Sequence, residues 1–156
     1  MRAKVNERSV IKANSQFWEQ MLAMTLEPVP SPAPFHAQSG HLLGSVALSG
    51  VWTGQVEVRL EQKLAYHSTG AMLLQAAESV SEADVLDATR EIANMIAGSL
   101  KSCLPQPCEM SVPEAAAQIA EYDRQPDTKD DLTVVFRHAA GDMMIRLSEQ
   151  DCLQQG

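Results

Sequence analysis

The chain has 156 residues, of which 45% are hydrophobic and 21% are charged, and these values predict one globular domain over residues 1–156. Its formal net charge of −8 argues against binding to nucleic acid or to an anionic membrane, because both require clustered lysine and arginine. The sequence has no secretory signal and no apolar run of about 20 residues, so a cytoplasmic protein is expected.

Cysteine and histidine spacing gives no sign of a metal centre. Three cysteines without a CxxC pair make a poor disulfide framework and a poor zinc site, so reduced thiols are favoured over a bridge or metal between Cys103 and Cys108. The four histidines lie on different predicted elements without metal-ligand spacing. No metal or other cofactor is therefore expected on this chain.

The first predicted helix runs from Val5 to about Leu26, because apolar residues recur at three- to seven-residue spacing and Asn6 can serve as its N-cap. The segment EPVPSPAPF then places four prolines at every second position, which removes backbone donors and favours an extended, polyproline-like connector. We expect this connector at 28–39, within the domain. A ligand for a proline-recognition domain is the less favoured alternative.

Two strands and a helix are predicted next. The segments HLLGSVALSG (41–50) and QVEVRLEQ (55–62) indicate antiparallel strands joined through the turn region between Gly50 and Gly54. The good helix formers of residues 62–77 predict a second helix, although a glycine interrupts it.

The third predicted helix has the clearest boundaries. Ser81 and Asp84 resemble a capping box at its start, and Pro105 forbids its continuation, so it should end near Cys103. We then expect a short strand in CEMSVP, a short helix in PEAAAQIAEY, a polar loop in DRQPDTKDD, and a closing hairpin of LTVVFRH and DMMIRLSEQ. This order of elements predicts an α+β fold, with helices packed on a mostly antiparallel sheet.

One side of the third helix carries a polar ridge. At about 100° per residue, its members fall within an arc of about 80°. They are Asp87, Glu91, Asn94, Gly98 and Lys101. The opposite side is apolar, with Val85, Ile92 and Ile96, so the ridge should face outward. Because a helical glycine costs about 1 kcal/mol relative to alanine, Gly98 suggests that a partner approaches the ridge closely.

Glu91 and Asn94 are the candidate chemical groups of this ridge. A carboxylate can hold a cationic group of a partner, and a neutral amide offers a donor and an acceptor that can orient a water molecule. Such a pair suits hydrolysis of a bond that the partner has already activated, where placing a water in line is the main requirement. The spacing ExxN is also common on solvated helix faces, and that interpretation stays open at this point.

The segment EIANMIAGSLKS has a Glu, two residues, an Asn and a following AG, and it lies between Asp87 and Pro113. In this pattern the sequence resembles the helix of the CheX-type chemotaxis phosphatases of the CheC/CheX-like superfamily, whose extended pattern Asp87 and Pro113 also match. The likeness extends to the VN that opens the first helix, the EP that closes it and the hairpin segment VALSGVWTGQVEV. The residues after Pro113, EAAAQIAEY, depart from the small and β-branched residues of the family.

The resemblance implies a phosphatase that hydrolyses the aspartyl phosphate of a response-regulator receiver domain, such as phosphorylated CheY. It implies that Asn94 orients the attacking water and that Glu91 pairs with a lysine of the receiver. The rest of the ridge, Asp87, Gly98 and Lys101, would bind this partner, and the receiver would supply Mg²⁺. A homodimer whose sheet continues across the interface is also implied. The alternative is a non-catalytic homodimeric module that binds a receiver domain.

Overall fold

The computed structural model describes residues 5–150 and has an α+β fold. Its helices are α1 (Glu7–Leu22), α2 (Gln62–Leu73) and α3 (Glu82–Lys101), with the short 3₁₀ helix η1 (Ala77–Ser79) between α2 and α3. Its strands are β1 (Glu27–Val29), β2 (His36–Ala37), β3 (His41–Gly50), β4 (Gly54–Glu61), β5 (Cys108–Met110), β6 (Glu114–Gln118), β7 (Tyr122–Asp123), β8 (Asp131–Arg137) and β9 (Met143–Glu149). The ends of the predicted domain, 1–4 and 151–156, lie outside the described residues. No helix in the described part of the chain has both the length and the apolar composition needed to cross a bilayer.

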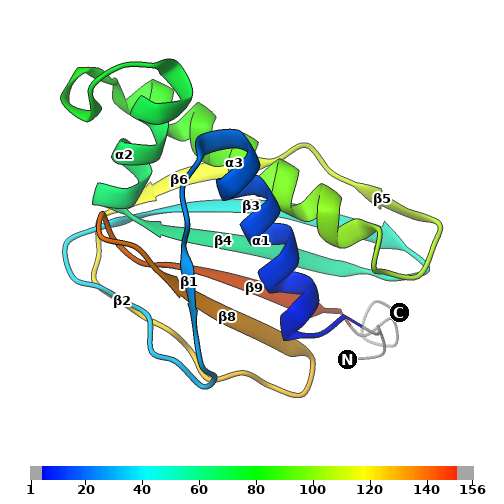
Figure 1. The fold of residues 1–156 in the computed structure, drawn as a ribbon. Coiled ribbons are helices and arrows are strands. Elements are labelled where there is room, and N and C mark those ends of the chain that lie inside the picture. The colour runs from blue at the N-terminus through cyan, green and yellow to red at the C-terminus, as the bar shows by residue number, and fades with distance from the viewer. Residues whose placement is uncertain (1–4, 151–156) are drawn as a thin grey trace.

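The main sheet has seven strands in the order β1-β8-β9-β4-β3-β5, and β6 also pairs with β3. All of these pairs are antiparallel, including the two hairpins predicted from the sequence, β3 with β4 and β8 with β9. The three α-helices lie on one face of this sheet (Figure 1). The predicted fold class, helices on a mostly antiparallel sheet, is therefore confirmed.

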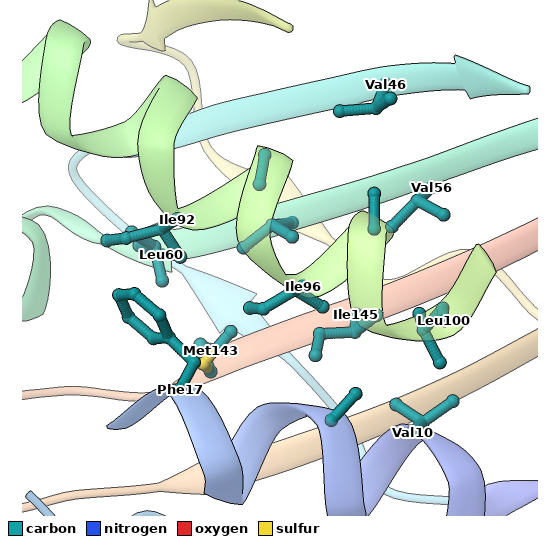
Figure 2. Close-up of a cluster of buried hydrophobic side chains, with 14 of the residues drawn as sticks. Val10, Phe17, Val46, Val56, Leu60, Ile92, Ile96, Leu100, Met143 and Ile145 are labelled. Carbon is teal, nitrogen blue, oxygen red and sulfur yellow. The ribbon is translucent and has the colours of Figure 1, made fainter. Parts of the chain in front are cut away.

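The core fills the space between these helices and the sheet. Side chains on one face of a strand recur at every second residue, so Val56 and Leu60 of β4 both point toward the helices. Both are 0% exposed. Helix α3 contributes Ile92, Ile96 and Leu100, which point toward the sheet and toward α1 (Figure 2). Each fully buried aliphatic side chain stabilises the fold by roughly 1.5–3 kcal/mol. This apolar face fixes which side of α3 remains available to solvent.

Helix α3 begins as the sequence predicts. The Ser81 hydroxyl accepts from the Asp84 backbone N–H at 3.1 Å, and an Asp84 carboxylate oxygen accepts from the Ser81 backbone N–H at 3.1 Å. Under the helix, Gly44 of β3 permits close packing, because a Cβ built there would lie 2.9 Å from the Ala93 Cβ. The helix is thus capped at its start and seated directly on the sheet.

The segment after α1 differs from the predicted polyproline-like connector. Helix α1 has the expected Asn6 cap but ends at Leu22, because Ala23 takes a left-handed conformation with φ 53°. Residues Glu27–Val29 then form β1, which pairs with β8 at the edge of the sheet, where a proline is tolerated. Further along, β2 pairs with β7 in a separate two-stranded ribbon. The prolines therefore lie in and around short strands.

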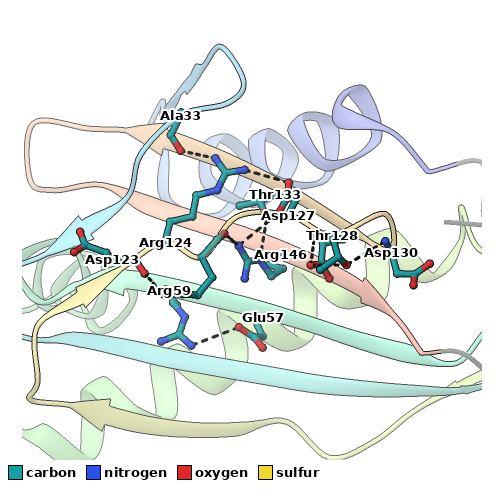
Figure 3. A network of polar contacts seen from close by, with 12 residues as sticks. Ala33, Glu57, Arg59, Asp123, Arg124, Asp127, Thr128, Asp130, Thr133 and Arg146 are labelled. Carbon is teal, nitrogen blue, oxygen red and sulfur yellow. Dashed lines mark hydrogen bonds and ion pairs between the residues drawn. The ribbon is translucent and has the colours of Figure 1, made fainter. Parts of the chain in front are cut away.

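Polar contacts hold the chain between β7 and β8 against the face of the sheet that points away from the helices (Figure 3). Arg124 donates to the Ala33 carbonyl oxygen and forms an ion pair with Asp127 at 3.1 Å. Asp127 also accepts from the Thr133 hydroxyl at 2.5 Å and lies 3.4 Å from Arg146. The predicted polar loop of residues 123–131 is consequently fixed at several points.

The predicted short helix in PEAAAQIAEY is wrong, since residues 114–118 form strand β6. This strand pairs with β3 from Ser45↔Glu114 to His41↔Gln118. Alanine is the best intrinsic helix former, but propensities differ by less than about 1 kcal/mol per residue among ordinary residues, and pairing with the free backbone groups along β3 outweighs that preference. Tertiary pairing therefore decides the conformation of this segment.

Candidate active site

The polar ridge predicted on α3 lies on the solvent side of the helix. Asp87, Glu91 and Gly98 are exposed, whereas Asn94 and Lys101 are half-buried. The opposite face is in the core, where Ile92 and Ile96 are 1% and 0% exposed. The structure thus brings all five predicted residues to one accessible face.

Glu91 and Asn94 are free of contacts that would occupy their polar atoms. Within residues 5–150 neither side chain has a hydrogen bond or an ion pair. Their spacing of three residues places them on neighbouring turns of the same helix face. A carboxylate and a primary amide are therefore presented together to any molecule that contacts this side of α3.

Arg90 is turned toward Asp87. Its guanidinium forms an ion pair with the Asp87 carboxylate at 2.6 Å, and the Asp87 side chain is 77% exposed. Because an exposed pair of this kind contributes only about 0.3–0.5 kcal/mol, a partner could replace it at small cost. Because Arg90 pairs with Asp87, it does not occupy the Glu91 carboxylate, which stays available to a cation of a partner.

Gly98 has open space around it. A Cβ built at this position would have no neighbouring heavy atom within 4 Å. The fold of residues 5–150 therefore gives no packing reason for a glycine here, although the glycine costs about 1 kcal/mol relative to alanine. This contrasts with Gly44, where the fold itself excludes a larger side chain.

Two exposed cations on α1 were not predicted as part of the site. Arg8 and Lys12 line a hollow together with Ser99 of α3 and Ser102, the C-cap residue of that helix, next to the ridge. Their spacing of four residues indicates a shared helix face. No pattern within the sequence indicates which helix that face adjoins.

One group of described residues combines an imidazole and two carboxylates, which are common ligands of metal cations, although the sequence analysis predicted no metal site. It lies on the β2–β7 ribbon and consists of His36, Glu121 and Asp123. The His36 ring lies 2.5 Å from an Asp123 oxygen and 3.3 Å from a Glu121 oxygen, and all three residues are exposed. The hydrogen bond with Asp123 raises the pKa of His36 above its usual 6.5. The His36–Asp123 pair links the two strands of the ribbon, and Glu121 directly precedes β7; the group is separate from the α3 ridge.

Comparison with known structures identifies the same fold in chemotaxis proteins. The CheX protein of Vibrio vulnificus superposes with a TM-score of 0.74 at 18% identity, covering 92% of this chain and 95% of that one. A CheC-like superfamily protein from Shewanella sp. PV-4 gives a TM-score of 0.74 at 19% identity, with coverages of 92% and 96%.

A third structure is the CheX–CheY–BeF₃–Mg²⁺ complex from Borrelia burgdorferi. It matches with a TM-score of 0.66 at 14% identity, covering 92% of this chain and 97% of that one. Among proteins with curated descriptions, none matches this sequence. Residues 42–137, more than half of the chain, match the family described as chemotaxis phosphatase CheX. The chain therefore belongs to the CheX family.

Proposed function

We propose that this protein hydrolyses the aspartyl phosphate of a response-regulator receiver domain, using Asn94 to orient water and Glu91 to bind the receiver. Membership of the CheX family supports a phosphatase, and the Borrelia burgdorferi relative is described in complex with CheY. The observation that carries the proposal is that the exposed Glu91 and the half-buried Asn94 lie side by side on the solvent face of α3, with no polar partner among residues 5–150.

Asn94 suits the reaction because the bond to be broken is already activated. An acyl phosphate has a good carboxylate leaving group, so the main requirement is a water molecule held in line with the P–O bond. The Asn94 amide oxygen can accept a hydrogen from that water, and its N–H₂ can donate to a phosphoryl oxygen. A new P–O bond forms to the water oxygen while the acyl P–O bond breaks, and the electron pair of the broken bond stays on the receiver's aspartate carboxylate. One proton of the water stays on its oxygen and the other passes to a phosphoryl oxygen, so both leave with the phosphate. The amide itself exchanges no proton.

Glu91 serves as the docking group in this proposal. Its carboxylate would pair with a lysine of the receiver, and an intermolecular ion pair of this type favours the bound orientation that delivers Asn94 to the phosphate. Asp87, Gly98 and Lys101 would complete the contact along the same face. The Mg²⁺ that supports phosphoryl transfer would be held by the receiver and not by this chain.

The decisive experiment separates catalysis from binding. A receiver phosphorylated with a small-molecule donor is mixed with the wild-type protein, Asn94→Ala or Glu91→Gln, and release of inorganic phosphate is followed. The proposal predicts acceleration by wild type, loss of acceleration with Asn94→Ala at unchanged affinity, and weaker binding with Glu91→Gln. If the wild type binds the phosphorylated receiver without accelerating its dephosphorylation, the protein is instead a non-catalytic receiver-binding module.

We also propose that the protein is a homodimer joined through β6. Among the described strands β6 pairs only with β3, so one side of its backbone faces outward, and such edges readily pair with another chain. Val112 and Ile119, on either side of β6, are 82% and 90% exposed, which indicates apolar surface that a second copy would cover.

Sedimentation velocity tests this arrangement. The wild type should sediment as a dimer and Ile119→Lys should shift it toward the monomer. Leu74→Lys is the matched control, because Leu74 is 93% exposed at the end of α2 and lies outside the proposed interface. A monomeric wild type at micromolar concentration, or equal effects of the two substitutions, would contradict the dimer.

A further inference from the structure

The most informative surface beyond the ridge is the hollow between α1 and α3, which we call the α1–α3 groove. It has a volume of about 550 Å³. Its polar lining includes Arg8, Lys12 and Gln16 of α1, Ser99 of α3 and the C-cap residue Ser102. Residues Val10 and Phe17 of α1 lie near Leu100 and Ile92 of α3, respectively, so the two helices run antiparallel (Figure 2). The first half of α1 therefore flanks the last turns of α3.

The α1–α3 groove borders the polar ridge directly. Ser102 follows Gly98 by four residues, which places it about one turn further along α3 and about 40° around the axis. Ser99 lies further around the same side, toward α1. A macromolecule that covers Glu91, Asn94 and Gly98 would consequently extend over the groove and meet the exposed flank of α1.

The exposed flank of α1 carries positive charge in its first half, which lies beside the last turn of α3. Arg8 and Lys12 are exposed and have no ion-pair partner within residues 5–150. Lys101, in the last turn of α3, adds a third cation at this end. Toward the other end of α1, Glu19 is exposed on the same helix face as Arg8, and α3 presents Glu91. The docking face is therefore positive at one end and negative at the other, in a chain whose net charge is −8.

We propose that Arg8 and Lys12 form a second docking contact for the phosphorylated receiver, binding carboxylates at the rim of its active site. This inference rests on the proposed function, because it requires Asn94 to enter that active site. A protein that holds Mg²⁺ beside an aspartyl phosphate does so with carboxylates and a phosphate oxygen, and the combined negative charge of the carboxylates and the phosphoryl group exceeds the +2 charge of the ion, so the face around the phosphate is negative. With the receiver's lysine at Glu91 and its carboxylates at Arg8 and Lys12, only one orientation across α3 satisfies both ends.

The physical role of this contact is to steer and orient the receiver. Cations at the rim of an interface raise the association rate and suppress wrong orientations, and their effect is screened within about 8–10 Å at physiological salt. Arg8 and Lys12 lie near the end of α3 that follows Asn94 by about two turns, too far to touch the reacting phosphate. The groove should therefore set receiver affinity and leave the rate of the bound complex unchanged.

The test compares matched charge reversals. Lys12→Glu lies in the α1–α3 groove, and Lys63→Glu reverses an exposed lysine on α2 outside it. Affinity is measured by titration with the receiver activated by BeF₃⁻ and Mg²⁺, and kcat is measured with the phosphorylated receiver at saturation. We expect Lys12→Glu to weaken binding at least about fivefold at low salt, with a smaller effect at 0.5 M salt, and the double variant Arg8→Glu/Lys12→Glu to weaken it further. Lys63→Glu should change affinity less than about twofold.

The two readouts separate this inference from the proposed function. If wild type and Lys12→Glu bind the activated receiver equally well, or if Lys63→Glu weakens binding as much, the groove contact is overturned even when catalysis is intact. A loss of kcat at saturation would also overturn it, because the contact would then act on the chemical step. If wild type binds but does not hydrolyse, the proposed catalysis fails and the groove contact is still decided by the affinities. Absence of any binding overturns both.

Discussion

Replacement of Gly98 by alanine should stabilise the protein and impair its reaction with a receiver. The position is in the interior of α3, and the added methyl group meets no heavy atom within 4 Å. Alanine at an unstrained helix position is favoured over glycine by about 0.5–1 kcal/mol, partly because it restricts the unfolded chain. For a chain of this length, that corresponds to a rise in Tm of roughly 1–4 °C.

The same methyl group would lie one turn from Asn94 on the proposed docking face. If a receiver backbone approaches there, the methyl group should lower kcat/KM by about tenfold, equivalent to about 1.4 kcal/mol, through a displaced complex. Denaturant unfolding and phosphate release on the same samples measure both effects. A less stable Gly98→Ala would refute the view that this position is open, and a stabilised variant with full activity would refute close approach of a partner.

Other consequences of the structure concern stability. Gly44→Ala should destabilise the fold by about 1–3 kcal/mol in urea unfolding, because its Cβ would lie 2.9 Å from the Ala93 Cβ beneath α3; an unchanged midpoint would contradict this packing. His41 is 3% exposed. Its burial is the main reason that its pKa is lowered from 6.5 to about 4, and the positive charge of the Arg59 guanidinium lowers it further. Its neutral form therefore contributes stability that is present above about pH 6.5 and is lost as the pH falls toward 4, so wild type should lose about 2–3 kcal/mol more than His41→Gln between pH 7 and 4.5. Equal losses in the two proteins would contradict the burial of a neutral imidazole.

Much of the fold could be predicted because the decisive interactions are local. The Ser81 capping box, the period-two pattern of β4 and the apolar face of α3 each lie within one element. Strand β6 could not be predicted in this way, because its alanines are strong helix formers and its conformation depends on pairing with residues 41–45. Strand β1 was missed for a similar reason, since Pro28 is compatible with a strand only at an edge, and edges are a property of the whole sheet.

In the candidate site, too, the features that could be predicted are the local ones. The positions of Glu91 and Asn94 on the exposed side of α3 follow from helical periodicity, and the structure places both there. The pairing of Arg90 with Asp87 is also local, at a spacing of three residues. By contrast, the α1–α3 groove joins residues about 90 positions apart, so no pattern within a single segment could reveal Arg8 and Lys12 as neighbours of the ridge.

The most direct test of the central claim is the single-turnover rate at which saturating protein dephosphorylates a receiver, measured for wild type and for Asn94→Ala. At saturation, differences in affinity vanish and only the positioning of water within the complex is compared. The rate constant of the wild type should exceed that of spontaneous dephosphorylation. Asn94→Ala should still bind the receiver, but its rate constant should be about 100-fold lower than that of the wild type or equal to the spontaneous one. A rate for Asn94→Ala within about twofold of wild type would show that the amide does not orient the attacking water.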